Sequence, residues 1–371
     1  MEYILIEECC DILDSRRIPI TASDRMSGPY PYYGANGIQD YVADYIFDDE
    51  LVLLAEDGGN FGSKTRPIAY RVSGKCWVNN HAHVLKPMAS MDVDYLCYSL
   101  MFYDTGELVN GATRQKLTQT AMRKMLIPQR SLQEQKRIVC ELSKVQSIIS
   151  ARQQQLQKLD ELVKARFVEM FGDPVQNSLK WVTKSLLELG YCKNGVNFHS
   201  GDSGIEIHCL GVGDFKDYSV VDGTDYLPTI SLSEEPPEES MLQDGDIVFV
   251  RSNGNKALVG RCLVVYPHNT PTTYSGFCIR YRLTSNEVNT SYLLRVLKAD
   301  SMRKKMIGRG ANIQNLNQKT LATLNVPIPP MELQEQFAEF VNQTGKSKVV
   351  VQKALDEAQT LFDSLMQEYF G

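Results

Sequence analysis

Ser131-Leu132-Gln133-Glu134-Gln135 opens a long apolar-periodic segment that ends at Phe171-Gly172-Asp173-Pro174, and a degraded copy of this segment closes the chain. The copy begins around Leu333-Gln334-Glu335-Gln336 and ends at Phe370-Gly371. The two LQEQ blocks lie 201 residues apart and the two Phe-Gly endings 199 residues apart. Similarity at a fixed spacing indicates a repeat architecture. One long repeat therefore spans about half of the 371-residue chain.

Both copies carry the pattern of a long helix. In the first, Ser131 and Glu134 form a capping box, which supplies hydrogen-bond partners for the first amides of a helix. Apolar residues then recur at alternating intervals of four and three over positions 138–170, and Arg152 and Arg166 are the two exceptions. This seam predicts a helix of about 40 residues, roughly 60 Å long, that packs against a partner helix.

The second copy keeps the same spacing from Phe340 to Leu365. Gly345 is expected to interrupt this helix, because glycine is a poor residue in a helix interior. Two such seams in one chain predict an antiparallel intramolecular coiled coil, which would hold two globular domains at opposite ends of a spacer rod. A coiled coil between two chains, with no role in DNA binding, is the alternative.

The segments between the helices repeat a mixed plan of strands and short helices, so the predicted fold class is α+β with two α/β domains. Leu51–Ala55 and Asp246–Val250 read as equivalent buried strands. Gly111–Leu117 aligns with Gly310–Leu316, which is the strongest match between the copies. The predicted boundaries are 1–129 for the first domain, 130–174 for the first helix, 175–330 for the second domain and 331–371 for the second helix.

Composition is that of an ordinary globular chain, with 43% hydrophobic and 23% charged residues. The sequence has neither an apolar run of the roughly 18 residues that a bilayer requires nor the features of a signal peptide. Nine cysteines without a CxxC pair predict reduced thiols in a cytoplasm. The net charge is −6, yet nine Lys/Arg and two acids lie in 280–319, and five Lys/Arg and no acid in 110–130. Two such runs at matching positions favour a polyanion-binding surface over ordinary solvated helix faces.

Motifs for catalysis or metal binding are incomplete. Gly345-Lys346-Ser347 resembles the end of a phosphate-binding loop but falls within a helix pattern. Pro29-Tyr30-Pro31-Tyr32 lacks the Asn and paired prolines of an amino-methyltransferase pocket. His81 and His83 share one strand face without a ligand at zinc-site spacing, so we interpret them as structural or groove-facing polar residues.

A metal-dependent nuclease site is equally incomplete. Glu56, Asp57 and Lys64 do not have the required spacing, and the second copy aligns Ser252 and Asn253 with the two acids. The sequence therefore predicts no catalytic residue, no metal ligand and no cofactor on this chain.

Two polar groups that recur in both copies are candidates for reading DNA, and a tyrosine-rich turn adds a third in the first copy. Arginine pairs with guanine and asparagine with adenine in the major groove, whereas lysine mainly neutralises phosphate. Polar turns that serve only backbone geometry are the alternative. Gln115 and Gln314 coincide, which predicts a shared backbone or phosphate contact. The predicted DNA-binding residues are Tyr32, Asn36, Asn60, Lys64, Arg66, Arg114, Gln115, Lys116, Arg251, Asn253, Asn255, Lys256, Arg261, Arg309, Asn312, Gln314 and Asn315.

The order of these elements resembles the DNA specificity subunit of type I restriction–modification systems. The likeness rests on Ile127-Pro128 and Val326-Pro327 ahead of the two LQEQ blocks, and on Phe167–Pro174 with its echo Met366–Gly371. Pro29–Val42 also looks like one recurrent class of target recognition domain. The resemblance covers essentially the whole chain.

This resemblance implies that each domain is a target recognition domain for one half of a split, asymmetric double-stranded DNA sequence. The helices would set the gap and dock two adenine methyltransferase (modification) subunits, which use S-adenosylmethionine. Restriction translocase–nuclease subunits would use ATP and magnesium, and this chain would be non-catalytic and cytoplasmic. A longer first helix would then lengthen the unread spacer. A standalone DNA-binding or scaffold protein is the main alternative, and an autonomous nuclease or methyltransferase is a second.

Overall fold

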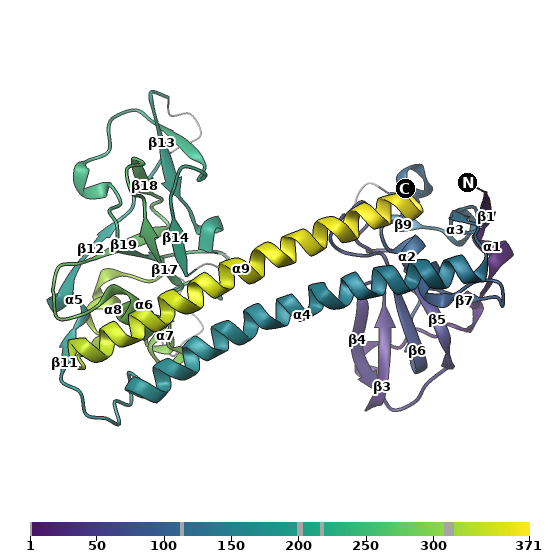
Figure 1. Cartoon of the computed structure of the whole chain (residues 1–371), viewed down its shortest axis with the longest axis horizontal. Coiled ribbons are helices and arrows are strands. Elements are labelled where there is room, and N and C mark those ends of the chain that lie inside the picture. The colour runs from purple at the N-terminus through teal and green to yellow at the C-terminus, as the bar shows by residue number, and fades with distance from the viewer. Residues whose placement is uncertain (1, 112–114, 199–202, 216–218, 308–314) are drawn as a thin grey trace. The chain divides into compact units, whose positions relative to one another are not determined.

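The structure is a computed structural model that describes residues 2–111, 115–198, 203–215, 219–307 and 315–371. By their contacts these residues form two compact units. Unit 1 consists of Met1–Gln154 and Gln352–Gly371, and unit 2 of Gln155–Val351. Each unit therefore combines a globular part with a portion of both long helices, α4 (Leu132–Phe171) and α9 (Met331–Phe370) (Figure 1). Both helices contain 40 residues, as the sequence predicts.

Unit 1 is built on a six-stranded mixed sheet with the order β2-β7-β5-β6-β3-β4. Side chains of the buried strand β5 alternate between two cores, as the period of two in a strand requires. Val52 and Leu54 join the core that includes α2 and the long helices, whereas Leu51 and Leu53 join a second cluster. In chain order the elements are β1 (Tyr3–Leu5), α1 (Ile6–Cys9), β2 (Cys10–Ile12), β3 (Ser27–Gly34), β4 (Gly37–Val42), β5 (Phe47–Ala55), β6 (Ala69–Val78), β7 (Ala82–Pro87), α2 (Val93–Met101), β8 (Val109–Asn110), β9 (Lys116–Leu117), α3 (Gln119–Arg123) and β10 (Leu126–Pro128).

Unit 2 repeats this plan on a five-stranded sheet with the order β12-β19-β16-β17-β14 and adds a three-stranded sheet, β15-β13-β18. Its buried strand β16 also alternates, with Ile247 and Phe249 facing the helical core and Val248 and Val250 facing the second cluster. The elements are β11 (Thr183–Ser185), α5 (Leu186–Leu189), β12 (Gly190–Asn194), β13 (Ile205–Leu210), β14 (Val220–Asp222), β15 (Thr229–Leu232), β16 (Asp246–Val250), β17 (Cys262–Tyr266), β18 (Thr272–Tyr274), β19 (Cys278–Leu283), α6 (Thr290–Lys298), α7 (Asp300–Ile307), α8 (Gln318–Ala322) and β20 (Asn325–Pro327).

The strand that leads into each long helix is held in the same way. β10 pairs antiparallel with β1, and β20 with β11. Each strand ends on a proline whose carbonyl accepts a hydrogen bond from a buried tyrosine hydroxyl. Tyr95 donates to Pro128 at 2.9 Å in unit 1, and Tyr292 donates to Pro327 at 3.0 Å in unit 2. These bonds fix where each helix leaves its domain.

A buried glutamine then fastens the first turn of each helix. Gln135 donates from Nε2 to the carbonyls of Ser90 and Arg130 and accepts at Oε1 from the amide of Asp92, at 2.7–3.0 Å. Gln334 makes the corresponding three bonds in unit 2, at 2.8–3.1 Å. The two side chains occupy equivalent places, and three satisfied bonds explain why glutamine is tolerated there in the core.

This equivalence corrects the alignment of the LQEQ blocks. Gln135 is the last residue of its block and Gln334 the second of its block, so the blocks are out of register by two residues. The true spacing of the repeat in the helices is 199 residues, which also relates Pro128 to Pro327 and the two Phe-Gly endings. The match of letters at 201 residues does not reflect equivalent positions.

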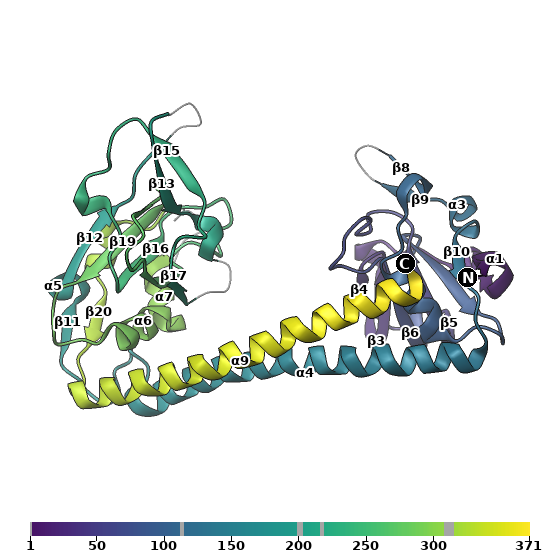
Figure 2. The same cartoon turned by 45° about the horizontal axis from the view of Figure 1, so that its top comes forward.

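The long helices pack antiparallel, as the sequence predicts. In unit 1 the beginning of α4, with Ile138 and Leu142, shares a core with Phe362 and Tyr369 near the end of α9. In unit 2 the end of α4 packs against the beginning of α9, where the rings of Phe167 and Phe337 lie 5.5 Å apart. Both views show the helices side by side (Figures 1 and 2).

The predicted capping box is confirmed, since the amide of Ser131 donates to Glu134 at 3.0 Å and the amide of Glu134 to the Ser131 hydroxyl at 3.3 Å. Two other details of the helix prediction are wrong. Gly345 does not interrupt α9, because it is exposed and an isolated glycine costs only about 1 kcal/mol relative to alanine. Leu361 is not on the seam but half-exposed, and its neighbour Phe362 is buried instead.

Among the described residues, none of the helices combines the length and the apolarity that crossing a lipid bilayer would demand.

We predict that Gln135→Ala destabilises unit 1 by about 1–3 kcal/mol, because the Asp92 amide and two carbonyls lose their buried partner. Trp77 lies in unit 1 and the second tryptophan, Trp181, in unit 2. Urea unfolding followed by Trp77 fluorescence in a Trp181→Phe background measures this loss. The control is Gln133→Ala, an exposed position in the same turn. Equal losses for the two variants would contradict the assignment.

Candidate nucleic-acid interface

In unit 1, two of the predicted DNA-binding groups meet at one edge of the sheet. The amide of Leu117 donates to the carbonyl of Glu56 at 2.7 Å, and Asp57 forms a β-bridge with Lys116. The amide of Gly58 reaches the carbonyl of Gln115 at 3.4 Å. The loop that follows β5 therefore lies against the segment that precedes α3. We call residues 56–66 together with 115–117 the loop edge of unit 1.

Unit 2 has the same arrangement. The amide of Leu316 donates to the carbonyl of Arg251 at 2.7 Å, and Ser252 bridges Asn315. Residues 251–261 with 315–316 form the loop edge of unit 2. The backbone bonds place Arg251 opposite Glu56 in the repeat and Ser252 opposite Asp57, so the alignment of Ser252 and Asn253 with the two acids is wrong by one residue.

The tyrosine-rich turn of unit 1 reaches the same loop edge. The side-chain amide of Asn36 donates to the carbonyl of Gly58 at 2.9 Å, and the Asn60 amide donates to the Asn36 side-chain oxygen at 3.2 Å. Asn36 is exposed and Asn60 half-buried. All three predicted groups of the first copy therefore come together, although their residues are up to 80 positions apart in the chain.

Tyr32 has a different place. Its side chain is 1% exposed, its hydroxyl accepts from the Ile20 amide at 3.0 Å, and the Arg25 guanidinium stacks 4.3 Å from its ring centre. A ring enclosed in this way is not available to a ligand, so we reassign Tyr32 from DNA contact to packing. The alternation of the strand β3 points it inward.

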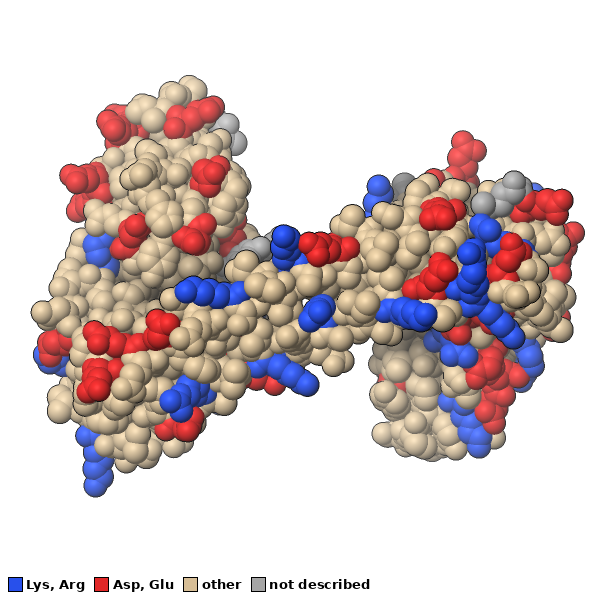
Figure 3. Space-filling model, viewed as in Figure 1, with Lys and Arg blue, Asp and Glu red and all other residues tan. Residues whose placement is uncertain are grey.

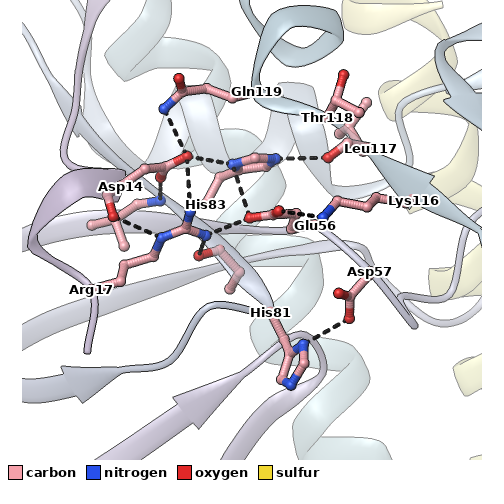
Figure 4. A network of polar contacts seen from close by, with 12 residues as sticks. Asp14, Arg17, Glu56, Asp57, His81, His83, Lys116, Leu117, Thr118 and Gln119 are labelled. Atoms are coloured by element: carbon pink, nitrogen blue, oxygen red, sulfur yellow. Dashed lines mark hydrogen bonds and ion pairs between the residues drawn. The ribbon is translucent and has the colours of Figure 1, made fainter. Parts of the chain in front are cut away.

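A buried network of charges supports the loop edge of unit 1 (Figure 4). Glu56 accepts from Arg17 at 2.6 Å and from Lys116 at 3.1 Å. Asp14 accepts from the Gln119 amide at 3.0 Å and from His83 at 2.6 Å. The network joins β7, the loop edge and the segment after β2, and it fixes the backbone on which Lys116 lies.

Both ring nitrogens of His83 face hydrogen-bond acceptors in this arrangement. Nδ1 faces Asp14, whose other oxygen accepts from the Val84 amide at 2.9 Å, and Nε2 lies 2.9 Å from the carbonyl of Leu117. Both partners only accept hydrogen bonds when Asp14 is ionised. Burial acts to raise the pKa of Asp14, but the hydrogen bond and charge of His83 and the Val84 amide together hold that pKa below its usual value.

Asp14, Glu56 and His83 also satisfy the spacing of a metal site, with one potential ligand atom from each within 4.8 Å of the others. A ligating histidine needs one unprotonated nitrogen, and both nitrogens of His83 already have acceptor partners. Arg17 and Lys116 supply positive charge in addition. We therefore assign the cluster to holding the loop edge rather than to binding a metal.

In unit 2, asparagine-capped turns shape the loop edge. Asn253 accepts from the Asn255 amide at 2.8 Å, and Asn255 accepts from the Ala257 amide at 3.0 Å, so each side chain caps the turn that follows it. Arg251 donates to the carbonyl of Gly276 at 3.3 Å. An open hollow of about 510 Å³ lies beside these turns, and its lining consists of Val212, Ser252, Asn253, Gly254, Lys256, Phe277 and Asn315.

The remaining predicted residues are less closely grouped. Lys64 and Arg66 are exposed in the loop after β5, while Arg261 is half-buried directly before β17. Arg114, Arg309, Asn312 and Gln314 lie outside the described residues. DNA contact by the exposed members of both loop edges stays a prediction.

The basic run of the second copy does not form one surface. Arg280 is 0% exposed and donates to the carbonyl of Glu239 at 3.1 Å. Arg282 binds Asp246 through two bonds of 2.8 and 2.7 Å. Strand alternation places these residues against the core and its rim. On the face in Figure 3, basic and acidic side chains of the described residues are interspersed.

Sequence reasoning missed Asp14 and Arg17, which lie far from the loop edge in the chain, and it also missed Gln119, which lies two residues after that edge. It also missed Phe277, which stands where His81 stands in unit 1. The amide of Glu56 donates to the carbonyl of His81 at 2.9 Å, and the amide of Arg251 to that of Phe277 at 2.8 Å. The pairing register places Phe277 and His81 at equivalent positions.

Comparison with known proteins decides the family. A family model described as "Type I restriction modification DNA specificity domain" matches residues 1–161 and 217–357, well over half of the chain. The chain belongs to this specificity family. It is a specificity subunit of a type I restriction–modification system, and the predicted resemblance is confirmed.

Individual proteins similar to this specificity subunit belong to the same family. A putative type I restriction enzyme specificity subunit of Haemophilus influenzae is 27% identical over 352 residues, which are 92% of this chain and 87% of the relative. The StySPI specificity subunit of Salmonella potsdam is 24% identical over 86% of this chain and 72% of its own. The crystal structure of the S subunit from M. genitalium has the same fold, with a TM-score of 0.59, 15% identity and coverage of 100% and 96% of the two chains.

We predict that Asp14→Asn destabilises unit 1 of the specificity subunit by about 3 kcal/mol at pH 6, because His83 and Arg17 lose their counter-charge. A carboxyl with a lowered folded pKa stabilises the fold above its unfolded pKa of about 3.9. This contribution is lost as the pH falls through the lower folded value. The difference between variant and parent should therefore shrink from pH 6 to pH 3.

Urea unfolding followed by Trp77 measures this difference at each pH. Asp11→Asn, an exposed position on β2, is the matched control. A loss from Asp14→Asn that is independent of pH would show that the ionised carboxylate is not what stabilises the network.

Proposed function

We propose that this specificity subunit reads a split, asymmetric sequence in double-stranded DNA, one half with the loop edge of each unit. The observation that carries the proposal is the equivalence of the two loop edges, which share backbone bonds but differ in side chains. Glu56 and Asp57 of unit 1 correspond to Arg251 and Ser252 of unit 2. A common frame with different side chains suits two different half-sites, in the way that identical subunits suit a palindrome.

Exposed and half-buried side chains on the loop edges have the chemistry for this role. Asn253 and Asn315 border the hollow of unit 2, and an asparagine amide pairs with adenine N6 and N7 in the major groove. Lys256 in unit 2 and Lys64 in unit 1 suit phosphate contacts, which position a protein without reading sequence. The amides of Asn36 and Asn60 lie next to each other in unit 1 and offer a corresponding pair.

The long helices would act as a spacer and as the docking surface for catalytic partners. α9 leaves Val349 and Val350 exposed, at 71% and 68%, and α4 leaves Ile148 exposed at 49%. Apolar side chains of this size on the surface suit contacts with other subunits. We infer that two adenine methyltransferase subunits with S-adenosylmethionine, and restriction subunits with ATP and magnesium, supply the catalysis, and that this chain supplies none.

Co-expression with the methyltransferase subunit tests the proposal. The complex should co-purify, and single-molecule methylome sequencing of a host that lacks other modification systems should reveal one bipartite asymmetric sequence. The control host carries the methyltransferase subunit alone and should show none. A chain that binds DNA tightly as a partner-free monomer, with no methylation in the complex, would instead support a standalone DNA-binding protein.

We predict that four helix-forming residues inserted into both long helices, after Gln154 and after Val351, lengthen the unread spacer by one or two base pairs. Four residues add about 6 Å and about 40° of rotation to a helix. One base pair adds about 3.4 Å and about 35°. Both helices are extended because an insertion in α4 alone would shift its seam along α9.

The methylome of cells that carry this variant measures the spacer and both half-sites together. Replacement of four exposed residues at the same places, without a change of length, is the control. Altered half-sites with an unchanged spacer would rule out the helices as the spacer.

A further inference from the structure

Phe277 and His81 occupy the same position in the two units. Each directly precedes the strand that pairs with the buried central strand, since Ala55 pairs with Ala82 and Val250 with Cys278. Each carbonyl accepts the amide of the first loop-edge residue, Glu56 or Arg251. Two independent features of the backbone therefore place these side chains equivalently at the loop edge.

Phe277 is an exposed ring on a fixed backbone. Its side chain is 63% exposed and lines the hollow of unit 2 with Asn253 and Asn315. Its carbonyl accepts from the amides of Arg251 and Ser252 at 2.8 and 3.3 Å. An aromatic side chain has only two torsions, so Phe277 loses little conformational entropy when a ligand covers its ring. Most residues that line the hollow are polar, and Phe277 has the larger of its two apolar side chains, the other being Val212.

His81 presents a polar edge at the equivalent place. Its Nδ1 lies 2.8 Å from the carboxylate of Asp57, which only accepts, so Nδ1 carries the proton. When the ring carries this one proton, Nε2 is an acceptor. Figure 4 shows the ring set apart from the buried charges around His83. The side chain of His81 is 35% exposed and that of Asp57 is 16% exposed, so the aspartate orients a histidine that a ligand can reach.

We propose that Phe277 and His81 are the equivalent specificity-determining side chains of the two units, Phe277 for the 5-methyl group of a thymine and His81 for the amino group of an adenine or cytosine. This inference rests on the proposed function. Thymine presents its methyl group in the major groove, where phenylalanine makes an apolar contact with it. Adenine and cytosine present an amino donor there, which the acceptor Nε2 of His81 matches. One position thus distinguishes the two half-sites.

The test uses the complex of this chain with its methyltransferase subunits and the bipartite sequence found by methylome sequencing. Duplexes in which one thymine at a time is replaced by deoxyuridine lack a single methyl group. One such duplex should bind the parent complex about threefold to tenfold more weakly, and Phe277→Ala should abolish that difference. Phe277→Leu, which keeps an apolar side chain, should retain part of it.

His81 is tested in the same way with duplexes that lack one amino group, with purine in place of adenine or pyrimidin-2-one in place of cytosine. The parent complex should bind one of these about tenfold more weakly, and His81→Ala should remove that dependence. Asp57→Asn leaves the ring in place but no longer fixes its proton, so it should weaken the dependence. Each of the two alanine variants serves as the control for the other, because each should affect one half-site only.

Four outcomes decide the matter. Loss of one dependence in each variant, confined to opposite half-sites, supports the proposal. Parent and variant complexes that respond equally to every modified duplex overturn it, as does a parent that is insensitive to all of them. A parent complex that methylates no bipartite sequence overturns the proposed function itself, and this inference with it. Urea unfolding with Trp181 fluorescence for unit 2, or Trp77 for unit 1, verifies that each variant is folded.

Discussion

The core of each unit is completed by the last aromatic residues of a helix that starts elsewhere in the chain, and the rest of the structure depends on this contact. Phe370 at the end of α9 lies 5.2 Å from Tyr95 in unit 1, and Phe171 at the end of α4 lies 4.8 Å from Tyr292 in unit 2. Both tyrosines also hold the proline at the start of the other helix. One buried ring therefore contacts a helix beginning and a helix end. A change of length or register in one helix alone would therefore open an aromatic core, whereas a matched change in both helices would not.

Because the helix contacts hold each unit together, the loop edges can differ between the units. The helix contacts, the paired strands β1–β10 and β11–β20, and the glutamines at 135 and 334 are the same in both units. The loop edges lie where the central strands β5 and β16 end, and the two edges share only their backbone bonds. Unit 1 stabilises its edge by buried charges around Asp14 and His83, whereas unit 2 uses asparagine-capped turns. The same frame can therefore present different chemistry.

Much of the fold could be predicted from the sequence because it follows from local periodicity. The length of both helices, the capping box at Ser131 and the buried strands at β5 and β16 all leave a signal within a short window. Register did not. The repeated LQEQ letters suggested a spacing of 201 residues, whereas the buried glutamines require 199. An error of one residue in the alignment likewise concealed that Arg251 corresponds to Glu56.

The candidate site was predictable in outline only. The match of Gly111–Leu117 with Gly310–Leu316 located the loop edges, and for Lys116, Leu117, Asn315 and Leu316 the backbone bonds agree with it. The supporting network could not be found, because Asp14 and Gln119 lie 105 residues apart and meet only through the sheet. Burial could not be predicted from residue type either, since the polar Tyr32 and Arg280 are buried while the apolar Phe277 is exposed.

The most direct measurement of whether each unit reads one half-site is the methylome of cells that carry a chain in which the globular part of unit 2 is present twice. Residues 182–327 would replace residues 2–128, a join at which Pro327 takes the place of Pro128 and Tyr292 the place of Tyr95. Because the helices are antiparallel, we expect a palindromic bipartite sequence made of one half-site and its inverted copy. Methylation of the original asymmetric sequence would contradict the assignment of one half-site to each unit.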